Sequence, residues 1–208
     1  MKKVIILVGS PRTNGNTVNI VKQVEALLKE SDIQTEIVIL DHHDIYPCHN
    51  CGSCEDTGDC IQKDAMKDLW KRIEASDGLI LASPTYYSAV TAQMKIFIDR
   101  TGRAKVIWDY KHNRPVGTRF SKGKGAMIIA VCGQSGERWL KCPLMQMRSL
   151  LADLEIPLYS IIKGDGADVG GGLFEGRPDM MIDIEEAARA FLEQNQEIVL
   201  DYKDTNIW

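Results

Sequence analysis

The stretch from residue 2 to residue 30, KKVIILVGSPRTNGNTVNIVKQVEALLKE, decides the fold of this chain. It opens with the apolar run Val4 to Val8, which is too short for a helix and typical of a buried strand. A polar loop follows at Gly9 to Thr17, and apolar residues then recur at helical spacing: Val18, Val21, Val24 and Leu28. The segment therefore predicts a strand, a polar loop and a helix in direct succession.

The same alternation continues along the chain. Further apolar runs predict strands at Ile37–Leu40, Leu79–Ala82, Met127–Val131 and Leu158–Ile162. Helical periods separate or follow them, at Met66–Ile73, Met94–Ile98, Leu144–Leu154 and from about Ile184 past Phe191. Strands that are apolar on both faces and alternate with helices predict a doubly wound α/β fold with a parallel sheet. Ligands of such folds bind at the carboxyl ends of the strands, so we expect the site in the loops after strands one, three and four.

Size and composition narrow the function. The chain has 208 residues, of which 44% are hydrophobic, and this suits one domain with an ample core. We expect a single domain over residues 1–208, with a cysteine-rich loop at 46–62, a long loop at 103–124 and a glycine-rich loop at 164–180. The net charge of −4 offers no attraction to nucleic acid or to an anionic membrane. The short first apolar run is neither a signal peptide nor a membrane span, so we expect a cytoplasmic protein that acts on small molecules.

The polar loop after the first strand is Gly9-Ser10-Pro11-Arg12-Thr13-Asn14-Gly15-Asn16-Thr17. Its side-chain donors lie next to the backbone N–H groups of a helix start, which favours a bound anion: Ser10, Thr13, Asn16 and Thr17. The loop lacks both G-x-G-x-x-G and G-K-[ST], so we expect a terminal monophosphate rather than a dinucleotide or a triphosphate. The alternative is an ordinary strand-to-helix turn in which Asn and Thr act as caps.

The loop after the third strand begins Ser83-Pro84-Thr85-Tyr86-Tyr87-Ser88. Pro84 rigidifies the turn, and Tyr86 or Tyr87 offers a flat apolar face on which an isoalloxazine ring could rest.

Together these motifs resemble those of a known family. Ser10-Pro11-Arg12 with Gly15-Asn16-Thr17, and Ser83-Pro84-Thr85-Tyr86 followed by Lys95 and Asp99-Arg100-Thr101-Gly102, are similar to the NADPH-dependent FMN reductase branch of the flavodoxin-like superfamily. The resemblance covers about Lys2 to Ile162 and implies a five-stranded sheet in the order 2-1-3-4-5 with FMN at the strand ends. With the clustered Cys48, Cys51, Cys54 and Cys60 added, the sequence resembles the iron-sulfur flavoprotein group, which builds a [4Fe-4S] cluster near the flavin.

The resemblance also implies roles for particular residues. The phosphate would be held by Ser10, Arg12, Asn16 and Thr17, with Thr13 in the same loop. The ring would be met by Pro84, Thr85, Tyr86 and Tyr87, and Ser88 in the same loop is a further candidate. A third contact would come from the loop after the fourth strand, at Gly133 and Gln134. Asp99 and Arg100 either form a local charge pair or act directly on the flavin.

Cys48, Cys51, Cys54 and Cys60 form a C-x2-C-x2-C-x5-C run within thirteen residues. Four thiolates match the requirement of a [4Fe-4S] cluster, although the spacing lacks the x3 gap and closing proline of bacterial ferredoxins. Zinc bound by the four thiolates, or by three with His49, is a second interpretation. Reduced thiols or a redox-active dithiol form a third. Disulfides are not expected in a reducing compartment.

We therefore expect an FMN-dependent oxidoreductase that passes electrons from NAD(P)H or a low-potential carrier to an acceptor such as a quinone, a flavin or a redox protein. No side-chain acid or base is expected to dominate, because the flavin carries the chemistry. The alternative from another class is a non-enzymatic electron carrier of the flavodoxin type. Family members commonly assemble, so we expect a homodimer or homotetramer.

Overall fold

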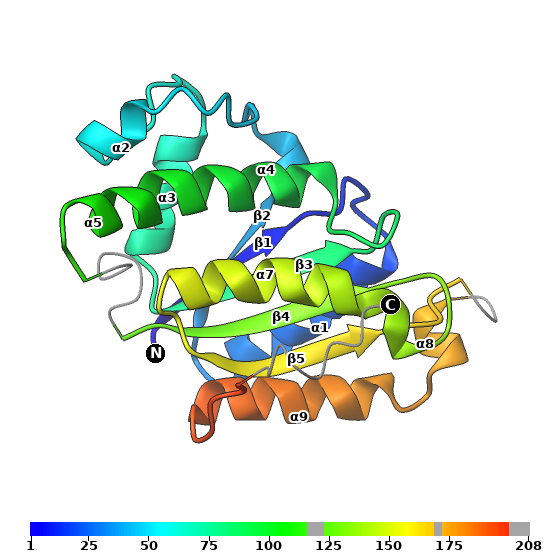
Figure 1. The fold of residues 1–208 in the computed structure, drawn as a ribbon. Coiled ribbons are helices and arrows are strands. Elements are labelled where there is room, and N and C mark those ends of the chain that lie inside the picture. Colours follow the sequence, from blue (N-terminus) through cyan, green and yellow to red (C-terminus); the bar gives the residue numbers. More distant parts are fainter. Residues whose placement is uncertain (116–122, 169–171, 200–208) are drawn as a thin grey trace.

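A computed structural model of the chain describes residues 1–115, 123–168 and 172–199. Five strands form one parallel sheet in the order β2-β1-β3-β4-β5 (Figure 1). The strands are β1 Lys3–Val8, β2 Gln34–Ile39, β3 Gly78–Pro84, β4 Gly125–Val131 and β5 Leu158–Gly164. The predicted fold class and strand order are confirmed.

Helices cover both faces of the sheet because each inner strand is apolar on both faces. In β1, Ile5 and Leu7 belong to the hydrophobic cluster on one face, whereas Val4, Ile6 and Val8 belong to the cluster on the other. The first cluster is covered by α3 (Met66–Glu74), α4 (Ala92–Thr101) and α7 (Lys141–Asp153). The second is covered by α1 (Asn16–Glu30) and α9 (Met180–Glu193) (Figure 1). Side chains thus alternate between the two faces with a period of two residues, and both faces are apolar, as a doubly wound sheet requires.

The carboxyl ends of the inner strands lie side by side at the same end of the sheet. The register places Val8 of β1 beside Ala82 of β3, and the N–H of Gly9 continues this ladder to the Ala82 carbonyl at 2.8 Å. The N–H of Thr85 likewise donates to the Val131 carbonyl at 2.6 Å. The loops that follow β1, β3 and β4 therefore start side by side, as the sequence predicts.

The segment expected as a loop at 103–124 is largely helical where it is described. Helix α4 continues without a break through the π-helix η2 (Gly102–Ile107) and α5 (Trp108–Lys111). Gly102 directly precedes the expected loop, but it has helical dihedrals of −56° and −48°, and Ala104 is buried against the core. Residues 116–122 of the expected loop lie outside the described residues.

The other two expected loops also contain short helices. The cysteine-rich loop follows the 3-10 turn η1 (Leu40–His42) and holds α2 (Ser53–Thr57). The glycine-rich loop holds α8 (Leu173–Gly176), and its residues 169–171 lie outside the description. The 3-10 helix η3 (Glu137–Leu140) precedes α7. No helix in the described part of the chain has the length and apolarity needed to cross a lipid bilayer.

Candidate functional site

A cavity of about 170 Å³ lies at the carboxyl ends of the strands. It is lined by loops after β1, β3, β4 and β5, which lie far apart in the sequence. The predicted cofactor residues that line it are Ser10, Arg12, Asn16, Thr17, Pro84, Thr85, Tyr86 and Gly133. Thr13, Tyr87, Ser88 and Gln134 do not line it. Gly15, Val131, Cys132, Ala167 and Asp168 complete the lining.

The loop after β1 presents an uncapped helix start to this cavity. Gly15 occupies the N-cap position of α1 and has no side chain with which to cap the helix. The first N–H groups of a helix have no partner within the helix, and their positive potential attracts anions. Ser10 and Thr17 lie buried at this point, and the Ser10 hydroxyl accepts a hydrogen bond from the Arg12 N–H at 3.2 Å. This arrangement supports the predicted phosphate loop.

Asn16 has a role that the sequence did not reveal. Its Nδ2 donates to the Ala167 carbonyl at 3.1 Å, and its Oδ1 accepts from the Leu173 N–H at 3.5 Å. The side chain thus joins the start of α1 to the loop after β5, which explains why Ala167 and Asp168 reach the cavity. The only sequence signal for this contribution was the run of glycines after the fifth strand.

The loop after β3 contains a buried hydroxyl and an exposed aromatic turn. Within the described residues, Thr85 Oγ1 is buried and has no hydrogen-bond partner. Tyr86 pairs with Ala89 across a tight turn whose central residues, Tyr87 and Ser88, have φ values of 48° and 60°. Such positive φ values cost non-glycine residues about 1–2 kcal/mol each. The turn holds the Tyr87 ring fully in solvent and Tyr86 about half exposed at the cavity.

The loop after β4 brings Gly133 against the Asp168 side chain. A Cβ atom at Gly133 would lie 1.9 Å from Asp168 Oδ2, so the Asp168 side chain would have to move to admit one. Next to it, Cys132 Sγ donates to the Gln134 carbonyl at 3.1 Å. Burial raises the pKa of the Cys132 thiol, so it stays protonated near neutral pH. Cys132 therefore contributes a neutral wall to the cavity.

The four clustered cysteines lie in the cysteine-rich loop, in and around α2. The loop turns at Gly52 and Gly58, whose φ values are 80° and 71°. Cys51 is exposed, whereas Cys54 and Cys60 are partly buried against the hydrophobic cluster under α3 and α4. Among residues 1–115, 123–168 and 172–199, no three Cys, His, Asp or Glu side chains are placed to share one metal ion.

The chemistry of these donors still fits an iron-sulfur cluster. Burial raises the pKa of the Cys54 thiol, the nearby Cys60 raises it further, and Cys48 adds to the effect. Cys48 and Cys60 thus lie close enough to Cys54 for their thiolates to repel its own, and a bound cation would relieve that repulsion. The loop has the number and kind of ligands that a four-iron cluster needs, although they do not converge in this structure.

Asp99 and Arg100 have different partners, and neither lines the cavity. Asp99 forms an exposed ion pair with Lys95 at 2.5 Å. Arg100 is 2% exposed and forms a buried ion pair with Asp64 instead. The expected local charge pair between Asp99 and Arg100 is therefore wrong, because the Arg100 side chain turns toward the cysteine-rich loop.

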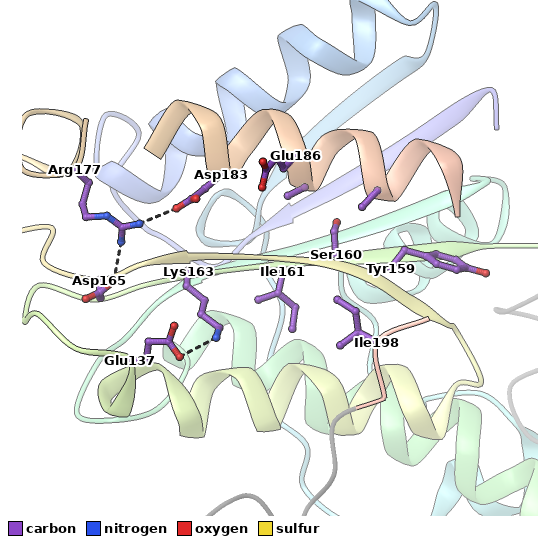
Figure 2. Close-up of a pocket in the computed structure, with 12 residues that line it drawn as sticks. Glu137, Tyr159, Ser160, Ile161, Lys163, Asp165, Arg177, Asp183, Glu186 and Ile198 are labelled. Carbon is purple, nitrogen blue, oxygen red and sulfur yellow. Dashed lines mark hydrogen bonds and ion pairs between the residues drawn. The ribbon is translucent and has the colours of Figure 1, made fainter. Parts of the chain in front are cut away.

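A second and larger cavity, of about 450 Å³, lies beside the edge strand β5 and contains none of the predicted residues (Figure 2). Five of its charged groups are paired with one another. Arg177 lies between Asp165 at 2.9 Å and Asp183 at 2.7 Å, and Lys163 pairs with Glu137 at 2.9 Å (Figure 2). The smaller cavity at the strand ends is the better candidate because it unites four loops and is lined by eight of the predicted residues.

Comparison with known proteins gives a family match over most of the chain. The sequence model of the NADPH-dependent FMN reductase family matches residues 2–163. An iron-sulfur flavoprotein of Archaeoglobus fulgidus is 46% identical over 101 residues, which are 47% of this chain and 44% of the relative. One of Methanocaldococcus jannaschii is 37% identical over 99 residues, 48% of this chain and 51% of the relative. These alignments span about half the length of the curated relatives.

Solved structures share the fold at low sequence identity. An NAD(P)H:quinone oxidoreductase from Methanothermobacter marburgensis superposes with a TM-score of 0.68 at 16% identity, over 96% of this chain and 98% of its own. An FMN-dependent NADH-azoreductase from Bacillus anthracis, solved in complex with FMN, gives 0.69 at 15% identity, over 91% of this chain and 98% of its own. At such identities the likeness shows a common flavodoxin-like fold.

Proposed function

The chain belongs to the NADPH-dependent FMN reductase family, and on this premise we propose that it binds FMN at the strand ends and acts as an FMN-dependent NAD(P)H oxidoreductase. Bound FMN would supply the hydride and electron chemistry. It would take electrons from NAD(P)H or a low-potential carrier and pass them to a quinone, a flavin or a redox protein.

One observation carries this proposal: the cavity that unites the anion-binding loop after β1 with the loops after β3 and β4. Parallel sheets bind ligands at this position, and a phosphate suits the uncapped start of α1. The buried Thr85 hydroxyl lacks a partner in the described chain, and a polar ligand would provide one. The cavity volume of about 170 Å³ is smaller than a typical cofactor site, so the ring must extend outward past the exposed Tyr86.

The chain's own residues would bind and orient the cofactor. The phosphate would be held by Ser10, Arg12, Thr13, Asn16 and Thr17. The ring would be met by Pro84, Thr85, Tyr86, Tyr87, Ser88, Gly133 and Gln134. The close contact of Gly133 with Asp168 would keep the loop after β4 in place, so that its backbone groups can face the ring.

The cysteine-rich loop extends the proposal to a [4Fe-4S] cluster held by Cys48, Cys51, Cys54 and Cys60. The names of the Archaeoglobus and Methanocaldococcus relatives support it, as does the set of four thiols in one loop. Such a cluster would let a two-electron flavin serve one-electron partners. Zinc and free thiols are the competing outcomes. We also propose that the protein forms a homodimer or homotetramer and is cytoplasmic.

An assay of steady NADH and NADPH oxidation tests the proposed oxidoreductase activity directly. Protein stripped of flavin would be assayed without oxygen for NADH and NADPH oxidation with a soluble quinone, before and after one equivalent of FMN is added. We expect turnover only after FMN is added. Stable FMN binding without turnover by either donor would instead favour the non-enzymatic electron carrier.

A further inference from the structure

The structure assigns Arg100 a positioning role: we propose that Arg100 anchors the cysteine-rich loop to α4 and donates a hydrogen bond to the sulfur of Cys60. The anchoring role stands on the protein fold alone. The consequence for a redox centre rests on the cluster in the proposed function.

The guanidinium of Arg100 contacts both the cysteine-rich loop and Asp64, which follows the loop. Its Nη1 donates to Asp64 Oδ2 and to the Tyr46 carbonyl, the latter at 3.0 Å. Its Nη2 donates to Asp64 Oδ1 at 3.1 Å and to Cys60 Sγ at 3.2 Å. The side chains of Arg100 and Asp64 are 1% and 0% exposed. Such a two-pronged contact needs the planar fork of arginine, which lysine cannot reproduce.

Asp64 joins the two ends of the loop to this contact. It accepts hydrogen bonds from the N–H of Tyr46 at 3.0 Å and the N–H of Met66 at 3.2 Å. The start of the loop, its end and the first residue of α3 therefore meet at one carboxylate, which Arg100 holds from α4. A buried ion pair that loses one partner leaves an uncompensated charge, so this contact should resist opening.

Helix α4 connects this anchor to the cavity. At its start, Thr91 Oγ1 donates to the Gly9 carbonyl at 2.7 Å, and the Thr91 N–H donates to Ser83 Oγ at 3.2 Å. Both partners belong to the chain next to the cavity. Nine residues of helix, about 14 Å along the axis, separate Thr91 from Arg100. One rigid helix thus sets the position of the cysteine-rich loop relative to the strand ends.

Other contacts join the cysteine-rich loop to the helical residues that follow α4, and they are more exposed. Glu55 pairs with Arg103 and with Lys111, whose side chains are 36% and 48% exposed, and such pairs contribute little. Cys54 Sγ donates to the Arg103 carbonyl at 3.7 Å, a long contact. The Trp108 ring packs against Gly58, where a Cβ would come within 3.0 Å. Arg100 is the contact with both full burial and several hydrogen bonds.

A hydrogen bond and a positive charge next to a ligating sulfur favour the reduced, more negative state of an iron-sulfur cluster. If Cys60 is a ligand, Arg100 should raise the reduction potential of the cluster. Replacement of Arg100 should therefore lower that potential.

Hydrogen exchange measured by mass spectrometry tests the anchor without any cofactor. In Arg100→Lys, exchange in peptides covering residues 46–64 should rise about tenfold or more relative to wild type, while peptides of β1 and β3 stay unchanged. Asp99→Asn is the matched control, because it removes an exposed pair one residue away, and it should leave the loop unchanged. If Arg100→Lys does not fold, Asp64→Asn, which keeps the shape of the carboxylate, provides the same comparison. Wild-type exchange in the loop of the folded variant would overturn the anchor.

Redox titration tests the bond to sulfur. Wild type and Arg100→Lys would be reconstituted with iron and sulfide without oxygen, and a lower potential in the variant is expected. Equal reduction potentials in wild type and Arg100→Lys would refute the proposed hydrogen bond from Arg100 to the Cys60 sulfur. A wild type that takes up no iron and sulfide would refute the proposed cluster, and with it the effect on potential, whereas the exchange experiment would still decide the anchor.

Discussion

Replacement of Thr85 by valine should change stability and cofactor affinity in opposite directions. In the described residues, Thr85 Oγ1 is buried without a hydrogen-bond partner, and Thr85 lines the cavity at the strand ends. Valine has nearly the same shape and removes the hydroxyl. The substitution therefore removes a desolvated polar group from the flavin-free protein and a hydrogen-bonding group from the FMN complex.

The expected size follows from this single hydroxyl. An unsatisfied buried polar group costs about 1–3 kcal/mol, so Thr85→Val should raise the free energy of unfolding of the flavin-free protein by about 1 kcal/mol. In the complex, the lost hydrogen bond is worth about 0.5–1.5 kcal/mol, which weakens FMN binding about 2- to 12-fold. Urea unfolding followed by tryptophan fluorescence measures the first effect. Titration of FMN fluorescence measures the second.

Thr91→Val is the matched control, because its hydroxyl is fully engaged. Thr91 Oγ1 donates to the Gly9 carbonyl at 2.7 Å and accepts from the Met94 N–H at 3.3 Å. Its loss leaves buried groups unpaired and should destabilise the flavin-free protein by about 1–3 kcal/mol. A Thr85→Val protein less stable than wild type would show that the hydroxyl has a partner. Unchanged FMN affinity would show that it does not meet the cofactor.

Further variants test other parts of the account. In Gly9→Ala the new Cβ would lie 2.8 Å from Thr91 Oγ1, so urea unfolding should show a loss of about 1–3 kcal/mol. In Gly102→Ala the new Cβ enters open space on a helical backbone, so the free energy of unfolding should rise by about 0.5–1 kcal/mol. Equal stabilities of the two variants would contradict the expected difference between them. Burial opposes ionisation of Asp64, but its hydrogen bonds outweigh burial and lower its pKa. The ionised carboxylate therefore stabilises the folded protein at pH values above the ordinary carboxyl pKa, and this stabilisation is lost as the pH falls through the lowered pKa. Asp64→Asn should therefore flatten the decline of stability on acidification from about pH 4 downward in denaturation series, and an unaltered decline would exclude this carboxylate as a cause. Cys51→Ser should abolish iron and sulfide binding in elemental analysis while FMN stays bound, and loss of both would show that the two sites are not separate.

The sheet and the place of the site were predictable because their signals are local. The run Val4 to Val8 identifies its own strand, and helical spacing identifies α1. Parallel strands then bring the loops after β1, β3 and β4 together without further information. This is why Ser10, Thr85 and Gly133 could be expected near one another, and all three line the cavity.

The remaining features depend on contacts between distant residues. Asn16 lies at the start of a helix, where asparagine commonly acts as a cap, yet its side chain donates a hydrogen bond to Ala167, 151 positions away. Arg100 follows Asp99 directly, yet its ion pair is with Asp64, 36 positions away, because the aspartate faces solvent and the arginine faces the core. Gly102 directly precedes the expected loop at 103–124, yet its backbone is helical, and Ala104 two residues further on packs into the core.

A comparison of FMN with riboflavin tests the central claim most directly. The proposed phosphate position is at the loop after β1 and the start of α1, where charge-assisted hydrogen bonds contribute about 1.5–3 kcal/mol each. Titration of flavin-free protein without oxygen should give one FMN per chain, with riboflavin bound at least about 100-fold more weakly. Equal affinity for the two flavins, or no saturable binding of either, would contradict the assignment of this cavity as an FMN site.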